Sequence, residues 1–302
     1  ALELARRNGS QTLASATVQL ERNVDPAACV MLGQPSGLPW TVIDQPDNDR
    51  SSIAGIGVAT ELKASGEGRF EAVATEWRRL AGSLGVFEEN GPSGSGPIAI
   101  GGFAFNGGSS SAGPWSAFGA SSMIVPSVAL RRKGNDTWLS LQVAPNPDDD
   151  LEELVSQVSQ AISVCSFDAD LVGLHPGESV EPSVISSVLS PAHYEAAVSG
   201  ALEAIDEGRI SKVVLAREVL VESKTPHSPA AVFSVLREVF PSCFIYSVRR
   251  GESTFVGASP ELLVRRQGSR ATTIALAGSA PRSADPAVDD HIGERLLRSE
   301  KD

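Results

Sequence analysis

Residues 210–221 constrain the fold of this chain more than any other run, because Ile-Ser-Lys-Val-Val-Leu-Ala-Arg-Glu-Val-Leu-Val is nearly apolar on both faces of an extended strand. Helix signals lie on either side of it. Ser190 and Pro191 suit the start of a helix that ends at Gly208, and another helix is predicted over Ser228–Val239. Further strands are predicted near residues 243–249, 253–256, 261–265 and 271–277. This alternation of strands and helices, with hairpins, predicts a layered α+β fold.

The N-terminal part also reads as mixed strands and helices. Its predicted elements are helices over 70–84 and 148–163, a buried strand over 97–105, and a β-hairpin whose strands, 123–131 and 138–143, flank a turn at 133–136. The polar stretch 173–182 marks the predicted subdomain boundary, which divides residues 1–185 from residues 186–302.

Charge and cysteine content exclude several classes of protein. The 302 residues include 25 Lys and Arg against 37 Asp and Glu, a formal net charge of −12. Such an acidic surface repels phosphate backbones and anionic lipids, so neither a nucleic acid nor a membrane is an expected partner. The three cysteines are far apart, odd in number and without CxxC spacing, which indicates reduced thiols in a cytoplasmic protein. The four histidines form no zinc-ligand pattern.

The end of the sequence reads as a helix without a stop signal. Asp285 and Pro286 suit its N-cap and first position, and Ile292, Leu296 and Leu297 form an apolar stripe at helical spacing. No glycine cap or proline follows. We therefore expect a fragment truncated at its C-terminus, with the apolar face of this helix more exposed than a core face.

Two residues are candidates for acid–base chemistry. Lys212 begins the predicted strand among Val and Leu, and Glu261 follows a Ser-Pro turn and precedes Leu-Leu-Val. Ionisable side chains are seldom fully buried, so a solvated lysine at a strand edge and a surface acid are the ordinary interpretations. The sharper interpretations are a partly desolvated amine that acts as a base and a carboxyl among apolar neighbours that donates a proton. Gly278 and Ser279, at the end of the last predicted strand, are either a turn or donors to an anionic ligand.

Three segments together resemble the chorismate-utilising enzyme family, and within it the isochorismate synthases. They are Ser-Lys-Val-Val-Leu-Ala-Arg at 211–217, Phe-Val-Gly-Ala-Ser-Pro-Glu-Leu-Leu at 255–263, and Leu-Ala-Gly-Ser-Ala at 276–280 running on to 296–302. Their order and spacing match from about Ser190 onward, and Gly-Gly-Phe-Ala-Phe at 101–105 is the best anchor before it. The resemblance implies an anthranilate synthase component I-like fold, with two packed β-sheets flanked by helices around a cleft for chorismate.

The resemblance also implies a role for each candidate residue. Lys212 takes the position of the general base that activates a water molecule for attack on C2 of chorismate, and Glu261 that of the acid that protonates the leaving C4 hydroxyl. Gly278 and Ser279 match positions that touch the substrate. Mg²⁺ is the implied cofactor, held by carboxylates. The family's metal ligands come after Asp302, so no metal ligand is assigned in this chain, and the fragment alone is expected to be inactive.

The lysine at position 212 separates activities within the family. Anthranilate and aminodeoxychorismate synthases use ammonia, usually carry a non-basic residue there and bring a glutamine amidotransferase subunit. Within this resemblance, Lys212 implies water as the nucleophile and isochorismate as the product. It also implies that no glutamine amidotransferase subunit is a partner, and we expect a monomer. Salicylate synthases share the lysine and are the nearest alternative; a degenerate, non-catalytic chorismate-binding relative is the other, against which Lys212 and Glu261 count. Whether the product supplies menaquinone or siderophore synthesis depends on neighbouring genes.

Overall fold

The computed structural model describes residues 1–33, 37–83, 85–87, 91–107, 113–171, 183–274 and 278–299. The helices of this described part are α1 (Leu2–Asn8), α2 (Pro26–Met31), α3 (Arg69–Gly82), α4 (Leu151–Ser163), α5 (Pro191–Asp206), α6 (Pro229–Val239) and α7 (Pro286–Leu297). Its strands are β1 (Ala14–Gln19), β2 (Trp40–Gln45), β3 (Ser51–Ile56), β4 (Thr60–Leu62), β5 (Gly85–Phe87), β6 (Ile100–Phe103), β7 (Ser121–Val125), β8 (Val128–Lys133), β9 (Asp136–Val143), β10 (Val184–Ser187), β11 (Val219–Glu222), β12 (Phe244–Arg250), β13 (Ser253–Ser259), β14 (Arg265–Gln267) and β15 (Arg270–Thr272). None of the helices described is long and apolar enough to cross a membrane.

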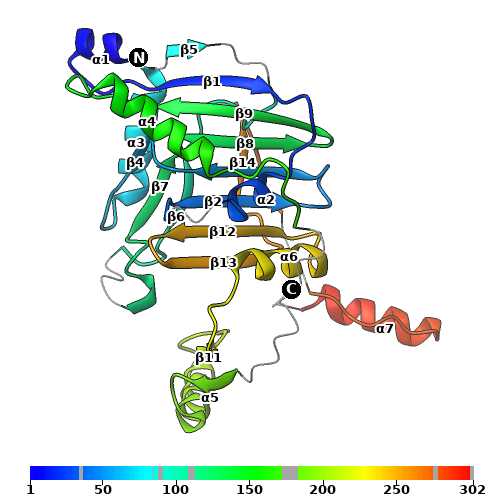
Figure 1. Ribbon diagram of the computed structural model, residues 1–302. Helices are drawn as coiled ribbons and strands as arrows, with labels where there is room; N and C mark the ends of the chain where they lie inside the picture. The colour runs from blue at the N-terminus through cyan, green and yellow to red at the C-terminus, as the bar shows by residue number, and fades with distance from the viewer. Residues whose placement is uncertain are drawn as a thin grey trace.

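Eight strands form one large sheet in the order β13-β12-β2-β3-β8-β9-β1-β5 (Figure 1). Neighbouring strands run antiparallel, except that β1 and β5 pair in parallel. The pairing of β2 with β12 joins distant parts of the chain, and it places Ile245 opposite Asp44. The predicted division at residue 185 stays a prediction, although strands from both sides of it build this one sheet. The predicted boundary stretch, 173–182, lies outside the described residues.

The strand predicted over 123–131 is wrong, because Pro126 divides it. β7 ends just before this proline and joins β4 and β6 in a separate three-stranded sheet, whereas β8 begins after it and pairs with β9 in the large sheet. Proline has no N–H for a strand ladder, so the chain changes sheets at this residue. The turn between β8 and β9 is confirmed, with Gly134 at a φ of 60°.

The predicted helices are confirmed, and four of them, α4, α5, α6 and α7, begin with a side-chain cap. The side chains of Asp150, Ser190, Ser228 and Asp285 each accept a hydrogen bond from a backbone N–H in the first turn of α4, α5, α6 and α7 respectively. These bonds satisfy N–H groups that have no partner within the helix itself.

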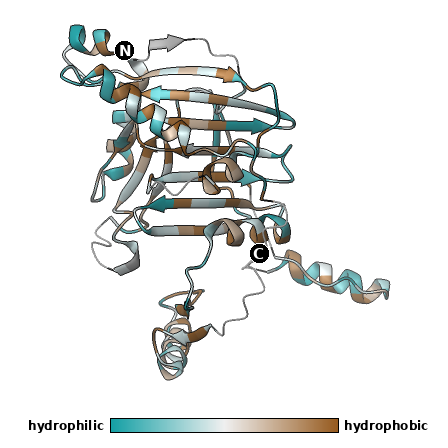
Figure 2. Ribbon diagram, in the orientation of Figure 1, coloured by the Kyte–Doolittle hydropathy of each residue, from teal (hydrophilic) through white to brown (hydrophobic). Residues whose placement is uncertain are grey.

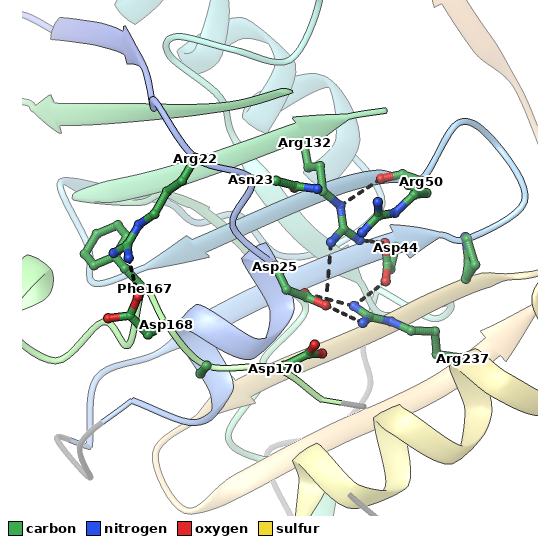
Figure 3. A pocket seen from close by; sticks show the side chains of 12 residues that line it. Arg22, Asn23, Asp25, Asp44, Arg50, Arg132, Phe167, Asp168, Asp170 and Arg237 are labelled. Carbon is green, nitrogen blue, oxygen red and sulfur yellow. Dashed lines mark hydrogen bonds and ion pairs between the residues drawn. The ribbon is translucent and has the colours of Figure 1, made fainter. Parts of the chain in front are cut away.

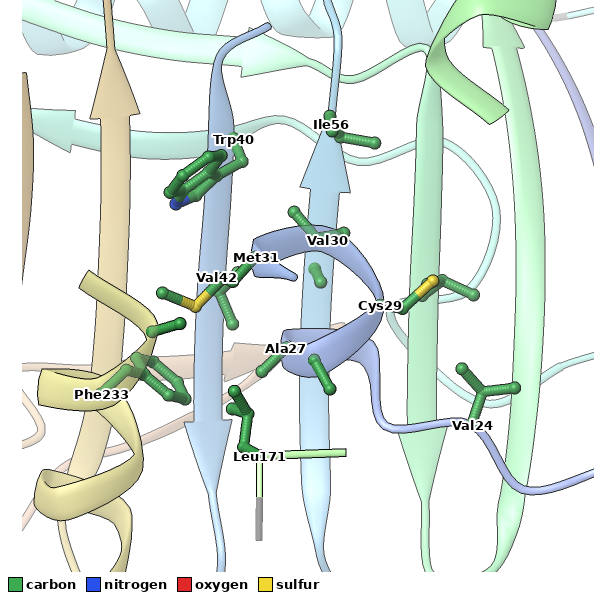
Figure 4. Packing of buried hydrophobic residues seen from close by; sticks show 14 of the residues in the cluster. Val24, Ala27, Cys29, Val30, Met31, Trp40, Val42, Ile56, Leu171 and Phe233 are labelled. Atoms are coloured by element: carbon green, nitrogen blue, oxygen red, sulfur yellow. The ribbon is translucent and has the colours of Figure 1, made fainter. Parts of the chain in front are cut away.

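The main hydrophobic core lies between the large sheet and α2, with α4 and α6 beside it. Trp40, Val42 and Ile56 of the sheet face the short helix α2, all six residues of which are buried, and Phe233 of α6 closes one side (Figure 4). Because β12 and α6 belong to the later part of the chain, this core also joins the two predicted regions.

The segment that carries α5, β10 and β11, and the helix α7, extend away from the large sheet (Figure 1). Ala204 is the only buried residue within α5, and α7 has none. Hydrophobic residues are nevertheless frequent on this segment (Figure 2), and Leu297 of α7 is 89% exposed. The prediction that the apolar face of the last helix is more exposed than a core face is confirmed, since Leu297 is exposed and Ile292 and Leu296 are half-buried.

Candidate active site

Lys212 lies in an exposed connecting segment and not in the predicted strand. β11 begins only at Val219, and it pairs with β10 over four residues. A strand that is apolar on both faces needs neighbours along its length, and the described part of the chain supplies one for its last residues alone. The prediction of a strand over 210–218 is therefore wrong for this structure, in which Lys212 is exposed and Val214 is 83% exposed.

Glu261 lies two residues beyond the end of β13. Its backbone N–H donates a hydrogen bond to Oγ of Ser259 (3.3 Å), and its side chain is exposed. The strand predicted over 261–265 is wrong, since β14 begins at Arg265. Oγ1 of Thr273 lies within hydrogen-bond distance of the carbonyls of Leu262 (3.4 Å) and Leu263 (2.7 Å), and it so joins the two ends of the β14–β15 hairpin. Leu263 is 86% exposed, so apolar neighbours do not enclose the carboxyl.

Gly278 is half-buried and Ser279 is exposed, ahead of the N-cap of α7. The strand predicted to lead into them, 271–277, is formed only as β15, and residues 275–277 lie outside the described residues. None of the four predicted site residues lines the charged cavity or the aromatic cavity described next. The structure does not bring the four together in either of them, and their roles stay predictions.

A cavity of about 480 Å³ opens beside α2 and carries a dense set of charges, and we call it the charged cavity (Figure 3). Its lining residues are Arg22, Asn23, Asp25, Asp44, Pro46, Arg50, Arg132, Phe167, Asp168, Ala169, Asp170 and Arg237. Arg237 holds both central carboxylates: its Nη1 and Nη2 lie 2.5 and 3.1 Å from Asp25, and Nη2 lies 2.5 Å from Asp44. Arg132 stands further off, at 3.6 Å from Asp25 and 3.7 Å from Asp44.

Burial and charge act on these two carboxyl groups in opposite directions. For Asp44, which has no solvent exposure, burial dominates and raises the pKa above its usual value in spite of Arg237 and Arg132. For Asp25, burial also raises the pKa, but the hydrogen bonds and charge of Arg237 outweigh it, so the pKa ends below its usual value. The two arginines and two aspartates balance in charge, so the cluster ties α2, β2, β8 and α6 together.

None of the site residues predicted from the sequence belongs to this cluster. An acid within the apolar strand Trp-Thr-Val-Ile-Asp-Gln and an Asp-Pro helix start are local signals that mark Asp44 and Asp25. No comparable signal marks Arg237, which lies 212 residues from Asp25 along the chain.

A second cavity, of about 460 Å³, is lined largely by aromatic side chains, and we call it the aromatic cavity. Its lining residues are Gly102, Phe103, Ala104, Phe105, Trp115, Phe118, Gly119, Ser122, Val248 and Phe255. The ring centroids of Trp115 and Phe255 are 5.3 Å apart, close enough for an edge-to-face contact. Phe255 begins the segment 255–263, so this cavity brings that segment beside the segment 101–105. Two of the sequence runs that resemble the family thus meet in space.

The described residues do not fit a magnesium ion. Nowhere in this part of the chain do three or more His, Cys, Asp or Glu side chains gather in a way that could hold a metal. Asp25 and Asp44, the two acids at the centre of the charged cavity, are already paired with Arg237 and Arg132.

Comparison with known proteins places these features in a family. The family model described as chorismate binding enzyme matches residues 1–302. The salicylate biosynthesis isochorismate synthase of Pseudomonas aeruginosa is 31% identical over 249 residues (82% of this chain, 50% of the relative), and the isochorismate synthase MenF of Bacillus subtilis is 27% identical over 238 residues (77% and 49%). This chain thus spans about half the length of these curated relatives. The fold matches the menaquinone-specific isochorismate synthase MenF of Escherichia coli with a TM-score of 0.64 and 20% identity, over 100% of this chain and 64% of that one. This chain belongs to the chorismate-binding enzyme family.

Proposed function

We propose that the protein containing this chain is an isochorismate synthase, which converts chorismate to isochorismate by adding water at C2 and removing the C4 hydroxyl. The observation that carries the proposal is the family match over the whole chain, joined with a lysine at position 212 and a glutamate at position 261. The names of the two curated relatives support the same reaction.

In this proposal each candidate residue performs one step. Lys212 takes a proton from the attacking water, and Glu261 gives a proton to the leaving hydroxyl from the other side of the ring. Gly278 and Ser279 offer a backbone N–H and a hydroxyl to the substrate. The exposed side chains of Lys212 and Glu261 leave both groups accessible to a ligand.

The proposal extends to cofactor, partners and location. Mg²⁺ is required, with its ligands outside the described residues, and it would stabilise the negative charge of the substrate carboxylate. The enzyme acts in the cytoplasm as a monomer, without a glutamine amidotransferase subunit, and its product supplies menaquinone or siderophore synthesis.

The test is a turnover assay of the full-length protein with chorismate, with and without Mg²⁺, in which the products are separated by chromatography and pyruvate is measured. We expect isochorismate without pyruvate, and loss of turnover when a chelator removes the metal. Release of pyruvate with salicylate would replace the proposal by a salicylate synthase. Unchanged chorismate under all conditions would instead indicate a non-catalytic relative.

A further inference from the structure

Two of the three cysteines lie together in the main core, although they are far apart in the sequence. Cys29 is on α2, and its side chain projects from the side of that helix (Figure 4). Cys165 follows the end of α4, and the N–H of the next residue, Ser166, donates a hydrogen bond to the carbonyl of Cys29 (2.9 Å). A Cβ added to Gly33 would lie 1.8 Å from the carbonyl oxygen of Val164. The backbone after α4 therefore packs directly against the backbone of α2 and the turn that follows it.

The two side chains pack into the same core, and the two thiols differ in character. The Cys165 thiol donates a hydrogen bond to the carbonyl of Ala161 (3.3 Å). The hydrogen bond to Cys165, together with burial, raises the pKa of Cys29, and the same hydrogen bond lowers the pKa of Cys165. Cys29 has no solvent exposure, whereas Cys165 is half-buried. The thiol that ionises more readily is thus also the one that a small oxidant can reach.

We propose that Cys29 and Cys165 are a redox modification site, at which hydrogen peroxide forms an intramolecular disulfide that a thiol reductant opens again. The thiolate of Cys165 attacks the peroxide, which breaks the O–O bond, gives a sulfenic acid on Cys165 and releases hydroxide. The sulfur of Cys29 then attacks the sulfenic sulfur, forms the S–S bond and releases water, while its own proton leaves with the hydroxyl. Two thiols and one peroxide thus give one disulfide and two waters.

The proposed disulfide between Cys29 and Cys165 would lie next to the charged cavity. Cys29 lies one turn beyond Asp25 in α2, and Cys165 lies two residues before Phe167, and both Asp25 and Phe167 line that cavity. The disulfide would therefore join two walls of the charged cavity covalently. Cys243 is buried in the same core, and it is not among the groups that act on the Cys29 and Cys165 thiols in the described part of the chain, so it serves as an internal control.

The test treats the reduced full-length protein with hydrogen peroxide, blocks the remaining thiols by alkylation and maps the peptides without reduction. We expect a linked pair of peptides that contain Cys29 and Cys165, its loss on treatment with a reductant, and an alkylated Cys243. The matched control Cys243→Ser should give the same linked pair. In Cys29→Ser, Cys165 should stop at the sulfenic acid and be captured by dimedone, while circular dichroism confirms that the variant is folded.

Three results would overturn the proposal. They are unchanged thiols at both positions, oxidation of Cys165 to a sulfinic acid while Cys29 is still alkylated, and a disulfide that includes Cys243 or a second molecule. Cys165→Ser gives an independent check, because Cys29 should then stay a free thiol under the same treatment. An oxidised Cys29 in that variant would show that the buried thiol reacts without its neighbour and would count equally against the proposal.

Discussion

Replacing Arg237 by methionine is expected to destabilise the protein, because it leaves two buried carboxylates without their main counter-charge. Of the two arginines, Arg237 lies closer to the carboxylates, with distances of 2.5–3.1 Å to Asp25 and Asp44. Arg132 lies 3.6 Å from Asp25 and 3.7 Å from Asp44. Methionine keeps an aliphatic side chain at this position and removes the guanidinium, whose carbon lies 5.5 Å from the centre of the Phe233 ring, so the change is chiefly one of charge.

The size of the loss follows from the burial of the partners. Removing one member of a buried ion pair costs about 3–5 kcal/mol. Because the side chain of Arg237 is 18% exposed while that of Asp44 is fully buried, we expect about 3 kcal/mol in the free energy of unfolding. A matched control is Arg78→Met, which removes an ion pair with Glu71 at an exposed site and should cost less than about 1 kcal/mol.

The cost should also depend on pH in a defined direction. In the wild type the pKa of Asp25 lies below its usual value, so the stabilisation by this carboxylate is present above about pH 4 and is lost as the pH falls through the folded-state pKa. Without the charge of Arg237, the pKa of Asp25 in the folded state should rise, and that of Asp44, which is already above its usual value, should rise further. A raised pKa means that stability falls as the pH rises through it, so the substitution should cost more at pH 8 than at pH 5.

The assay is urea unfolding of wild type and variants at both pH values, followed by tryptophan fluorescence, since Trp40 is buried in the core beside β12. A double variant, Asp44→Asn with Arg237→Met, should recover part of the loss because it removes one unpaired charge. A cost equal to that of Arg78→Met, or one that is the same at pH 5 and pH 8, would refute the reasoning.

Two further predictions concern other parts of the molecule. In the full-length protein, Lys212→Ala and Glu261→Gln should each lower chorismate turnover roughly 10²–10⁴-fold, because general acid–base catalysis contributes about that much to the rate. Chorismate should still bind to both variants. Near-normal turnover of the Lys212 variant would exclude this lysine as the base. Gly33→Ala should lower the free energy of unfolding in urea by about 1–3 kcal/mol, because its Cβ would overlap the carbonyl oxygen of Val164. The control Gly82→Ala, which has open space around it, should raise the free energy of unfolding by about 0.5 kcal/mol. Equal effects of the two substitutions would contradict the packing described.

Helix starts are the part of this fold that sequence reasoning predicts best, because their signals are local. Ser190 and Ser228 precede a proline and cap the helix that follows, and each does so through a backbone N–H a few residues away. Strands are harder, since their stability comes from partners elsewhere in the chain. The run 210–221 has the composition of a central strand, but the described part of the chain gives it a neighbour over Val219–Glu222 alone.

For the candidate site, too, the sequence predicts local motifs better than it predicts their arrangement in space. The motifs around Lys212 and Glu261 are visible in the sequence, but their arrangement in space depends on non-local packing, and the structure leaves both exposed. The charged cavity shows the reverse case. Its ion pairs are well defined in the structure, yet nothing near Arg237 in the sequence indicates that it meets Asp25 and Asp44.

The position of β12 inside the large sheet means that β2 receives its outer neighbour late in protein synthesis. β2 ends at Gln45 and β12 begins at Phe244, so about 200 residues are made between them. At translation rates of roughly 5–20 residues per second, this interval lasts roughly 10–40 s. Throughout it, one edge of β2 offers unpaired N–H and C=O groups, and the core face around Trp40 lacks the cover of α6. The nascent chain is therefore expected to depend on chaperones more strongly than the finished chain does when it refolds with both partners present.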